Sequence, residues 1–476
     1  MSSSRLVLAS TDKSDLPNVI LTMTDDQGWG DTGYNGHPIL KTPHLDEMSA
    51  SGIRFDRFYA ASPVCSPTRG SCLTGRHPFR YGIDWALGAG QKTREGRLRR
   101  QERTLADLLK PSGFRTGHFG KWHLGLDRSD GELKPTPGQH GFETWFSSTG
   151  NVPTYNPSVI PPELQHQNLM YFRNNIRAAE PLLGDDAKII TDNALQFIQA
   201  AVRDKRRFLA VIWFHTPHWP IVASPEFLPL YRGLPPGQQT YYSSLSAADA
   251  QLGRLRQQLR QLGVADNTMH WFASDNGPEG KVAAGDFPGS AGSFRGRKRS
   301  LFEGGIRVPG MLIWPARIPK ARTTNVACST SDYYPTVMAA TGASLADQPR
   351  PLDGINLMPL VEGRMRGRPR PIAFQTLGNR DLTLGSPRLA IIDQRFKLLS
   401  ELDDSEDLLF DLDKDPGEKQ NLASQKPEMV ARLRTALADF RASCLKSFNG
   451  GDYQARRLRP GQYSASASTR PEGAIL

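Results

Sequence analysis

Reactive side chains stand at the ends of four short apolar segments of this chain. Asp25 and Asp26 follow the segment at residues 19–23, and the other three run into the pairs Lys121 and His123, His215 and His218, and Asp275 and Asn276. Short apolar runs are typical of buried strands, and in an open parallel sheet the functional crevice lies beyond the carboxyl ends of the strands. We therefore expect one shared site that contains Asp25, Asp26, Lys121, His123, His218, Asp275 and Asn276.

Any single residue of this set has a simpler interpretation. An Asp or Asn at a strand end is usually a turn residue, and a lone His is usually a hydrogen-bonded surface or core group. The repetition at four strand ends is what favours a shared site.

The residue types suit a divalent cation and an anionic substrate. Three carboxylates and an amide carbonyl are hard oxygen ligands, which Ca²⁺ and Mg²⁺ prefer and which zinc and copper do not. Carboxylates that gather without a cation repel one another, so a bound metal is the simplest way to balance them. The lysine and histidines add positive charge and proton donors. The sequence therefore predicts a metal-assisted hydrolase of a phosphate or sulfate ester.

Helical patterns alternate with the apolar segments in the first part of the chain. Thr104 is a candidate helix cap, and Gly263 would end a helix with one apolar face, made of Leu245, Ala248, Leu252, Leu255, Leu259 and Leu262. Alternating helices and strands predict an α/β domain with a large mixed, mostly parallel sheet sandwiched by helices. We assign this catalytic domain to residues 17–340, after a flexible N-terminal extension at residues 1–16.

The pattern changes after residue 340. The segments "RPIAFQT", "RLAIIDQRFKLLS" and "DLLFDL" resemble short strands, and a helical segment that follows them has Val430, Leu433, Leu437 and Phe440 on one face. A C-terminal subdomain is therefore predicted at residues 341–447, with a small antiparallel sheet packed against one helix. Residues 448–476 are rich in Ser, Arg, Pro and Gly, which predicts a flexible tail.

The formal net charge of +11 favours acidic partners, and part of it is concentrated at residues 92–103, in Lys92, Arg94, Arg97, Arg99, Arg100 and Arg103. This segment has no interleaved aromatic residues, and the chain has no helix-turn-helix or RNA-binding signature, so nucleic acid is not an expected partner. A solvated loop is the simpler interpretation, and an acidic substrate stays open.

Membrane insertion is not indicated, because no apolar run approaches the roughly 18 residues that would span a bilayer. The N-terminal "LVLA" is far shorter than the apolar core of a secretory signal, so the sequence predicts a cytoplasmic protein unless its start is incomplete. Four cysteines, at positions 65, 72, 328 and 444, are too few for a disulfide framework, and none forms a CxxC pair.

The segment "CSPTRGSCLTGR" from Cys65 resembles the maturation motif of the type I sulfatases, in which a cysteine followed by x-Pro-x-Arg is oxidised to formylglycine. The blocks "DDQG", "CSPTRG", "GKWHLG", "TPHWP", "SDNG", "GRKRSLFEGGIRVP" and "DYYPTV" also follow the order of that family, as does "LLFDLDKDPGEKQNLA" near the end. The resemblance covers roughly residues 17–423 and is highly specific as a set. It implies the core fold of the alkaline phosphatases.

The resemblance also implies a metal centre and a modified residue. Asp25, Asp26, Asp275 and Asn276 match the family's calcium ligands, with Mg²⁺ as the alternative ion. Cys65 matches the residue that a formylglycine-generating enzyme converts to 3-oxoalanine (formylglycine); one oxygen of its hydrate contacts the metal and the other attacks sulfur. A hydrated aldehyde has a second hydroxyl group, which an ordinary thiol lacks. Deprotonation of this second hydroxyl can expel the sulfate, so no water molecule needs to attack sulfur.

Other matches concern substrate binding and proton transfer. Arg69 matches the arginine that steadies formylglycine, and Lys121 and Lys298 match the pair that binds sulfate oxygens. His123 matches the residue that helps deprotonate the hydrate, and His218 the group near the leaving oxygen. Asn151 is a candidate for a further sulfate contact. His215 falls outside the motif and is interpreted as structural, and Cys72 as a packed residue.

The resulting prediction is a sulfuric ester hydrolase, arylsulfatase-like, acting on a sulfated carbohydrate or a sulfated small molecule. One alternative is a phosphonate monoester or phosphodiester hydrolase of the same superfamily. Another is an inactive polyanion-binding homologue, although no expected ligand is missing from the motifs. Substrate specificity is expected to depend on the loops at residues 82–103 and 151–183.

Overall fold

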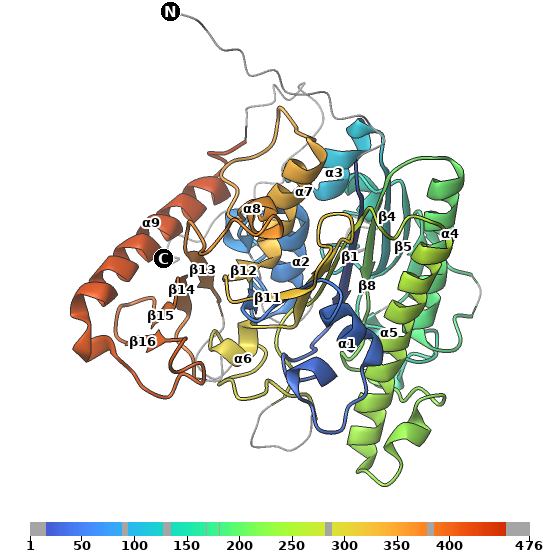
Figure 1. Ribbon diagram of the computed structural model, residues 1–476, viewed down its shortest axis with the longest axis horizontal. Coiled ribbons are helices and arrows are strands. Elements are labelled where there is room, and N and C mark those ends of the chain that lie inside the picture. Colours follow the sequence, from blue (N-terminus) through green and yellow to red (C-terminus); the bar gives the residue numbers. More distant parts are fainter. Residues whose placement is uncertain are drawn as a thin grey trace, which may run out of the picture.

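The computed structural model describes residues 16–87, 94–126, 135–167, 169–179, 181–280, 288–377 and 385–453. Its main feature is a ten-stranded sheet in the order β11-β2-β10-β9-β1-β8-β4-β5-β6-β7 (Figure 1). The five central strands are all parallel: β9 (Thr268–Ser274), β1 (Asn18–Thr24), β8 (Phe208–Trp213), β4 (Arg115–Lys121) and β5 (Thr144–Ser148). The predicted mixed, mostly parallel sheet is confirmed.

Shorter strands extend this sheet on both sides. One side adds β10 (Gly310–Ile313), β2 (Ile53–Phe55) and β11 (Arg322–Thr324), and the other adds β6 (Tyr171–Arg173) and β7 (Ile176–Arg177). Of these, β10 and β6 run antiparallel to the central strands that they pair with. A separate two-stranded pairing joins β3 (Phe58–Tyr59) to β12 (Cys328–Ser329).

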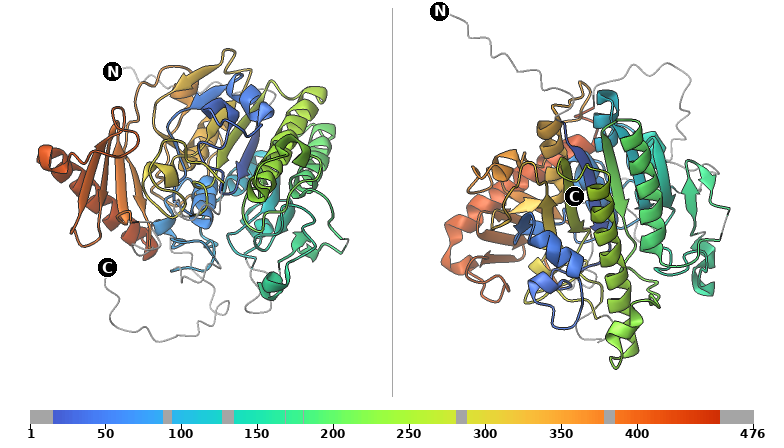
Figure 2. Two further views of the ribbon diagram at one scale, coloured as in Figure 1. Left: turned by 90° about the horizontal axis from the view of Figure 1, so that it is seen from below. Right: turned by 45° about the vertical axis from the view of Figure 1, so that its right-hand side comes forward.

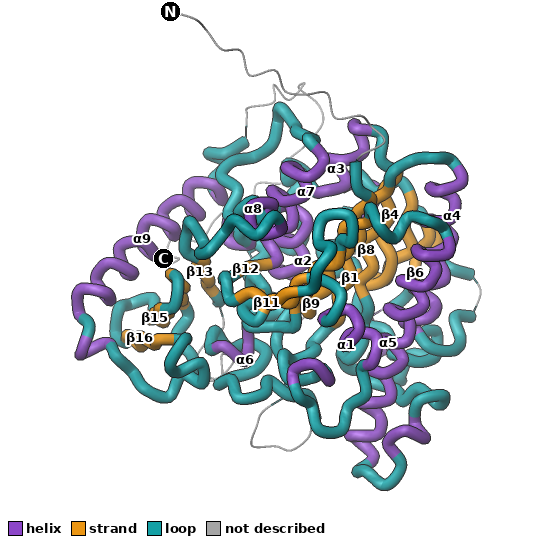
Figure 3. The backbone as a smooth tube through the Cα atoms, viewed as in Figure 1, coloured by secondary structure: helices purple, strands orange, loops and turns teal. Residues whose placement is uncertain are grey.

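Helices cover both faces of the sheet, as Figure 3 shows. The longest ones, α4 (Asp186–Arg203) and α5 (Pro236–Gln261), pack on each other and on one face, and α1 (Pro43–Ser49) packs on α5. The opposite face carries α2 (Cys65–Thr74), α3 (Leu105–Leu109) and α7 (Tyr333–Thr341). The short helices α6 (Glu303–Ile306) and α8 (Met358–Val361) lie in the connections between β9 and β13.

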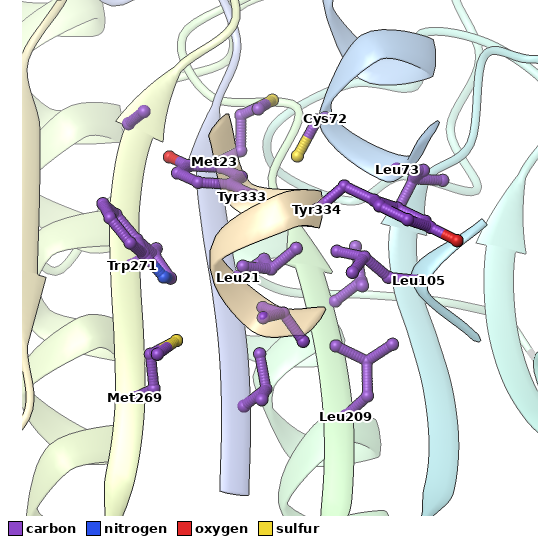
Figure 4. Packing of buried hydrophobic residues seen from close by; sticks show 14 of the residues in the cluster. Leu21, Met23, Cys72, Leu73, Leu105, Leu209, Met269, Trp271, Tyr333 and Tyr334 are labelled. Atoms are coloured by element: carbon purple, nitrogen blue, oxygen red, sulfur yellow. The ribbon is translucent and has the colours of Figure 1, made fainter. Parts of the chain in front are cut away.

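Strand β1 explains the two layers, because its side chains alternate between two cores. Leu21 and Met23 belong to the core that contains Leu73 of α2 and Tyr334 of α7, whereas Ile20 belongs to the core under α4 and α5. Figure 4 shows the first of these cores from close by. A strand that is apolar on both faces needs a helical layer on each of them, so the continuous apolar run of β1 determines the sandwich.

The C-terminal part forms its own antiparallel sheet, in the order β13-β14-β15-β16, and one long helix covers it. Its strands are β13 (Ile372–Gln375), β14 (Leu389–Asp393), β15 (Phe396–Ser400) and β16 (Asp407–Asp411), and the helix is α9 (Pro427–Phe448). Figure 2 shows this unit at one side of the molecule, away from α4 and α5. The predicted sheet and helix are confirmed, and "RLAIIDQRFKLLS" forms two strands rather than one because the chain turns at Gln394 with a φ of 54°.

Order continues past the predicted start of the tail. Phe448 is the last residue of α9, and Asp452 pairs with Arg76 at 2.9 Å. The division at residues 340 and 341 stays a prediction, and residues 1–15 and 454–476 lie outside the described part of the chain. Within the described residues, no helix combines the length and the apolar character that a membrane span requires.

Candidate active site

Four adjacent strands bring the predicted residues together. The strands β9, β1, β8 and β4 are neighbours in the sheet and run parallel, so their carboxyl ends meet at one edge. Asp275 and Asn276 follow β9, Asp25 and Asp26 follow β1, His218 follows β8, and Lys121 ends β4. The predicted site residues therefore lie together at one edge of the sheet, as expected. Their proximity results from the order of the strands in the sheet, which cannot be read directly from the sequence.

Close backbone packing fixes the end of β4 beside β8. Gly120 has a φ of 96°, and a Cβ at this position would lie 1.9 Å from the carbonyl oxygen of Trp213 in β8. Only glycine adopts this conformation at this distance without strain. The glycine of "GKWHLG" therefore places Lys121 and His123 at the sheet edge.

Cys65 is the first residue of α2, at the same edge. Its side chain is 1% exposed, and no side-chain cap occupies the preceding position, Val64. The N-terminal amides of α2 therefore face the site and favour negative charge there. Burial raises the pKa of the Cys65 thiol to about 11, although Lys121 and Lys298 act in the opposite direction, so the thiol is protonated near neutral pH.

Every carboxylate of the site has a cationic neighbour. Arg69 of α2 lies 2.6 Å from Asp275 Oδ2 and 3.2 Å from Asp25 Oδ2. Lys121 Nζ donates to Asp25, and Lys298 Nζ lies 2.7 Å from Asp26 Oδ2. Protein cations therefore balance much of this charge, and the expected repulsion is still present, since, beyond the effect of burial, Asp25 and Asp26 raise the pKa of Asp275.

The pKa shifts of Asp25 and Asp275 follow from this pairing. Burial opposes the charge of Asp25, but Lys121, His218 and Arg69 together hold its pKa well below the usual range. Burial and the neighbouring Asp25 raise the pKa of Asp275 to about 7, although Arg69 opposes that shift. The two carboxylates therefore titrate as a coupled pair, in which burial and Asp25 disfavour the charge of Asp275.

Unpartnered oxygens give a better test of whether a cation fits. Asp25 Oδ1 and Asn276 Oδ1 are buried and have no hydrogen-bond partner, which is costly for polar atoms unless something binds them. Asp25, Asp26, Cys65 and His218 each offer a ligand atom, and these atoms lie within 4.8 Å of one another. The residues present fit a hard divalent cation, and Asp25, Asp26 and Asn276 are the candidate oxygen ligands.

Asp275 is placed differently from the other expected ligands. Its Oδ2 binds Arg69 and its Oδ1 accepts the backbone N–H of Asp26 at 3.1 Å. Asn276 Nδ2 donates to Asp26 Oδ1 at 2.7 Å, which leaves the Asn276 carbonyl oxygen as the open atom. In the structure as described, Asp275 thus orients Arg69 and the turn at Asp26.

Backbone conformation at the site is unusual for residues that carry a Cβ. The φ angles of Asp26, His123 and Arg299 are 65°, 51° and 78°, all in the left-handed region. Such conformations cost free energy and persist where the surroundings impose them. Asp26 and His123 follow the ends of β1 and β4, and Arg299 follows the site residue Lys298, so each of these conformations lies at the candidate site.

The two predicted catalytic histidines are neutral and have defined tautomers. His123 Nε2 lies 2.8 Å from the carbonyl oxygen of Leu87, so this nitrogen carries the proton and the buried Nδ1 is an unpartnered acceptor. Burial and Lys121 hold the pKa of His123 well below its usual range. His218 Nδ1 donates to the carbonyl oxygen of Trp219, which leaves Nε2 as the acceptor.

His218 Nε2 faces the centre of the site. It lies 3.3 Å from Asn151 Nδ2 and 3.7 Å from Asp26 Oδ2. Burial, then Lys298 and Lys121, lower the pKa of His218 to about 4. Asn151, which the sequence analysis placed near the substrate, is therefore a neighbour of His218.

Two residues interpreted as structural are indeed packed inside the protein. His215 is fully buried, with Nδ1 at 2.8 Å from Asp186 Oδ2 and Nε2 at 2.7 Å from Ser148 Oγ. Cys72 is fully buried, and Figure 4 shows it near Leu73 and Tyr334 in the core. Neither side chain is available for chemistry.

Sequence reasoning missed Glu279. Its Oε2 lies 3.1 Å from Lys298 Nζ, and both of its oxygens also bind Arg299. Lys298 Nζ is therefore paired with both Glu279 and Asp26. The available signal was its place three residues after Asn276, directly behind a strand end.

The described part of the basic segment is largely neutralised. Arg94 pairs with Asp84, Arg99 with Glu95 and Arg103 with Asp347. Arg94 and Arg99 also lie over the ring of Phe448 in α9, at 4.1 and 4.5 Å from its centroid. This segment thus attaches α9 to the large domain, and Lys92 lies outside the described residues.

A sheet edge with carboxylates, two lysines, two neutral histidines and an open pair of buried oxygens is typical of hydrolases that act on anionic esters with a metal ion. Comparison with known proteins makes the assignment specific. The family model for sulfatases matches residues 17–343, and the model for the C-terminal region of N-sulphoglucosamine sulphohydrolase matches residues 289–443. The chain belongs to the sulfatase family.

Individual relatives agree with the family model. Human N-acetylgalactosamine-6-sulfatase is 33% identical over 372 residues, which cover 74% of this chain and 67% of that protein. Human arylsulfatase A is 32% identical over 452 residues, or 88% of this chain and 86% of the relative. Among solved structures, Ps i-CgsB in complex with k-i-k-neocarrahexaose has a TM-score of 0.77 and 26% identity, covering 89% of this chain and 92% of that chain. The large domain therefore has the alkaline phosphatase-like fold of the sulfatases.

Proposed function

We propose that this protein hydrolyses a sulfate ester to an alcohol and inorganic sulfate, with a formylglycine made from Cys65 as the nucleophilic residue. The observation that carries the proposal is the position of Cys65. In a chain of the sulfatase family, it begins α2 at the edge where the ends of β9, β1, β8 and β4 meet.

Two groups that the chain does not encode directly would complete the site. Formylglycine in its hydrated form supplies one hydroxyl that attacks sulfur and a second whose deprotonation releases sulfate. A divalent cation, for which we propose Ca²⁺ with Mg²⁺ as the alternative, supplies Lewis-acid stabilisation of charge on the sulfuryl oxygens. Asp25, Asp26 and Asn276 would hold the cation, with Asp275 completing the set that the family resemblance implies.

In this proposal the two lysines bind the sulfate ester, and Arg69 orients residue 65. Lys121 donates to Asp25 and Lys298 to the neighbouring Asp26, so an anionic ester bound at these carboxylates would have two ammonium groups near it. Arg69 is fully buried and tied to Asp275, and it would fix the orientation of residue 65 one helical turn away. Asn151 would add a polar contact to the sulfate group or keep His218 in place.

The histidines move protons. His123 Nδ1 is an open acceptor, suited to take a proton from the attacking hydroxyl. His218 Nε2 would donate a proton to the leaving oxygen. A bound ester brings negative charge next to this ring, which raises the pKa of His218 from its low value toward that of an acid catalyst.

A sulfated carbohydrate is the proposed substrate class. Trp219 follows His218 directly, and 44% of its surface is exposed, which is unusual for so large an apolar ring. An exposed aromatic face beside the leaving-group position suits the apolar face of a sugar ring. Relatives support this proposal, since one is named N-acetylgalactosamine-6-sulfatase and a structural neighbour was solved in complex with k-i-k-neocarrahexaose.

The first experiment examines residue 65. The protein is produced with and without a formylglycine-generating enzyme, and the tryptic peptide at residues 58–69 is analysed by mass spectrometry. We expect the mass of an aldehyde in place of the thiol, and activity in proportion to the converted fraction. Cys65→Ala should be inactive, whereas Cys72→Ala, a buried cysteine in the same helix, is the matched control. Active protein with only a thiol at residue 65 would overturn the mechanism.

A second experiment examines the reaction. Turnover of an aryl sulfate is compared with that of an aryl phosphodiester, and a large preference for the diester would favour the phosphonate or phosphodiester alternative. Tight binding of a sulfated glycan without sulfate release by fully converted protein would indicate a polyanion-binding homologue. Trp219→Ala should raise KM for a sulfated oligosaccharide more than for a small sulfate ester.

A further inference from the structure

Glu279 adds a second carboxylate to Lys298, one of the two lysines that would bind the sulfate group. Lys298 Nζ lies 2.7 Å from Asp26 Oδ2 and 3.1 Å from Glu279 Oε2. Asp26 alone would balance the single charge of the ammonium group. Neutralisation of the lysine therefore does not explain why a second carboxylate stands beside it.

The carboxylate of Glu279 is held in one place by the segment that carries Lys298. Both of its oxygens bind the guanidinium group of Arg299. The backbone carbonyl oxygen of Glu279 accepts from Nε and Nη2 of Arg297, at 3.1 and 2.8 Å. The backbone N–H of Lys298 donates to the carbonyl oxygen of Pro278 at 3.1 Å. Glu279 is thus a negative charge at a fixed distance from the lysine.

This carboxylate is charged and close to solvent. Burial opposes the charge of Glu279, but Lys298 and Arg299 hold its pKa well below the usual range. The side chain of Glu279 is 20% exposed and that of Arg299 is 34% exposed, so the pair is not part of the closed interior. Because Glu279 contacts the ammonium group that would touch the substrate, its charge acts on any anion held there.

The reaction changes the charge of the bound anion, and on this point the inference rests on the proposed function. A sulfate ester carries one negative charge. Net hydrolysis consumes one water, breaks the bond between sulfur and the alcohol oxygen, and yields a neutral alcohol, one proton and a sulfate ion with two negative charges. Repulsion from a fixed carboxylate is proportional to the charge of the anion, so it opposes the product about twice as strongly as the substrate.

We propose that Glu279 is a specificity-determining residue, which disfavours doubly charged sulfate beside Lys298 relative to the singly charged ester and thereby promotes release of the product. Lys298 would attract both anions, and Glu279 limits that attraction more for the dianion than for the ester. Arg299 carries the opposite charge and offsets part of this effect.

The test compares two tetrahedral anions that differ in charge, inorganic sulfate with two negative charges and sulfamate with one. Isothermal titration calorimetry measures their Kd on protein that contains formylglycine and a bound cation. Glu279→Gln should bind sulfamate about threefold and sulfate about tenfold more tightly than the parent, because the electrostatic free energy doubles with the charge of the anion. Equal gains for both anions, weaker binding of sulfate, or a parent that binds neither anion overturns the proposal.

Two further variants separate charge from structure. Arg299→Gln removes the opposite charge, so it should weaken the binding of sulfate more than that of sulfamate. Glu279→Asp keeps the charge and should retain the ratio of the two affinities found in the parent. A loss of folding does not produce shifts of opposite sign in Glu279→Gln and Arg299→Gln. Shifts of the same sign in these two variants, or a shift in Glu279→Asp as large as that in Glu279→Gln, contradict the proposal.

Kinetics distinguishes this inference from the proposed function. In Glu279→Gln, the inhibition constant of sulfate should fall by a larger factor than KM for an aryl sulfate, and neither quantity depends on the fraction of active protein. A parent that releases no sulfate from an aryl sulfate contradicts the proposed function. An active parent, with the same ratio of sulfate to sulfamate affinity in Glu279→Gln, overturns the role of Glu279 alone.

Discussion

Two buried charge clusters in this protein have similar composition and different connectivity. The site cluster consists of Asp25, Asp26, Asp275, Asn276, Arg69, Lys121 and Lys298. The junction cluster consists of Glu303, Glu418, Lys397, Arg307 and Tyr59, where the C-terminal sheet meets α6. Both are almost completely excluded from solvent.

The junction cluster is closed upon itself. Lys397 Nζ lies 2.9 Å from an oxygen of Glu303 and 2.9 Å from an oxygen of Glu418. The second oxygen of Glu418 accepts the backbone N–H of Glu303 at 2.6 Å, and that of Glu303 accepts from Tyr59 at 3.0 Å. Three of the four carboxylate oxygens accept a hydrogen bond, and the fourth, Glu418 Oε1, has no hydrogen-bond partner but is ion-paired with Lys397 Nζ. Every oxygen of the two carboxylates therefore has a hydrogen-bonded or charged neighbour.

The site cluster is incomplete by the same measure. Its charges are balanced, but Asp25 Oδ1 and Asn276 Oδ1 remain without partners. The difference shows that charge balance alone does not separate a functional cluster from a structural one. The separation comes from buried oxygens that have neither a hydrogen bond nor an ion pair, which the junction cluster lacks and the site cluster keeps.

The largest expected effect is on activity. Asp25→Asn keeps the shape of the side chain but removes the charge that would hold the cation, so kcat/KM on an aryl sulfate should fall by about 10³-fold or more. The matched change in the junction cluster, Glu303→Gln, should lower stability first and leave the turnover of the folded enzyme near that of the parent. Similar losses of turnover in both variants would contradict the distinction between the clusters.

The next largest effect is on stability. Lys397→Met removes the one cation between Glu303 and Glu418 and leaves two carboxylates together in the interior. The free energy of unfolding should fall by about 3–5 kcal/mol, because a buried charge loses its partner. Denaturant unfolding measures this, with Lys414→Met on the exposed surface as the control. A loss below about 1 kcal/mol would show that solvent reaches this cluster.

Removal of the divalent cation should lower the stability of the protein through the site cluster and not through the junction cluster. A cation that binds the folded chain alone stabilises it by about 3–4 kcal/mol at concentrations of about 100–1,000 times its Kd. Thermal unfolding with Ca²⁺, with Mg²⁺ and with a chelator should show this shift in the parent and in Lys397→Met, but not in Asp25→Asn. A parent protein with the same unfolding temperature in all three solutions would argue against a metal centre.

The smallest effect concerns pH. Burial, together with Glu303, raises the pKa of Glu418 to about 7 in the folded protein, although Lys397 opposes the shift. The unfolded chain releases this proton at lower pH, so this contribution to stability is present below about pH 4.5 and is lost as pH rises through 7. The loss should reach about 3 kcal/mol at most.

The variant Glu418→Gln tests whether the contribution of Glu418 to stability falls or grows as pH rises. The difference in unfolding free energy between the parent and Glu418→Gln should fall as pH increases from about 5 to 8. Glu362→Gln, at an exposed position, should show no such trend. A difference that grows with pH would mean that the pKa of Glu418 is lowered, not raised, in the folded protein.

Much of the fold could be predicted because its signals are local. The apolar run that became β1, the periodic leucines of α5 and the cap at Thr104 depend on neighbours within a few residues. Thr104 does accept from the N–H of Asp107 in a reciprocal capping box. The helix α9 was predicted but extends to Phe448, because the guanidinium groups that pack on the ring of Phe448, those of Arg94 and Arg99, come from a distant segment.

The site could be predicted as a set of residues but not as an arrangement. The motifs identified Asp25, Lys121, His218 and Asn276, and the resemblance added Arg69 and Lys298. What no motif stated was that Asp275 would hold Arg69, or that Glu279 would flank Lys298. These depend on which loop tips meet, and loop geometry is set by contacts between segments far apart in sequence.

By itself, the sequence determined the element types, the family and the choice of groups that we propose to react, since each rests on residue types at short spacing. The tertiary structure alone decided that β9, β1, β8 and β4 are neighbours, and therefore that their ends share one edge. It also decided which buried cluster is closed and which is open, because that depends on the partner of every oxygen. Hydrogen bonds are short-ranged and directional, so those partners are fixed only once the chain has folded.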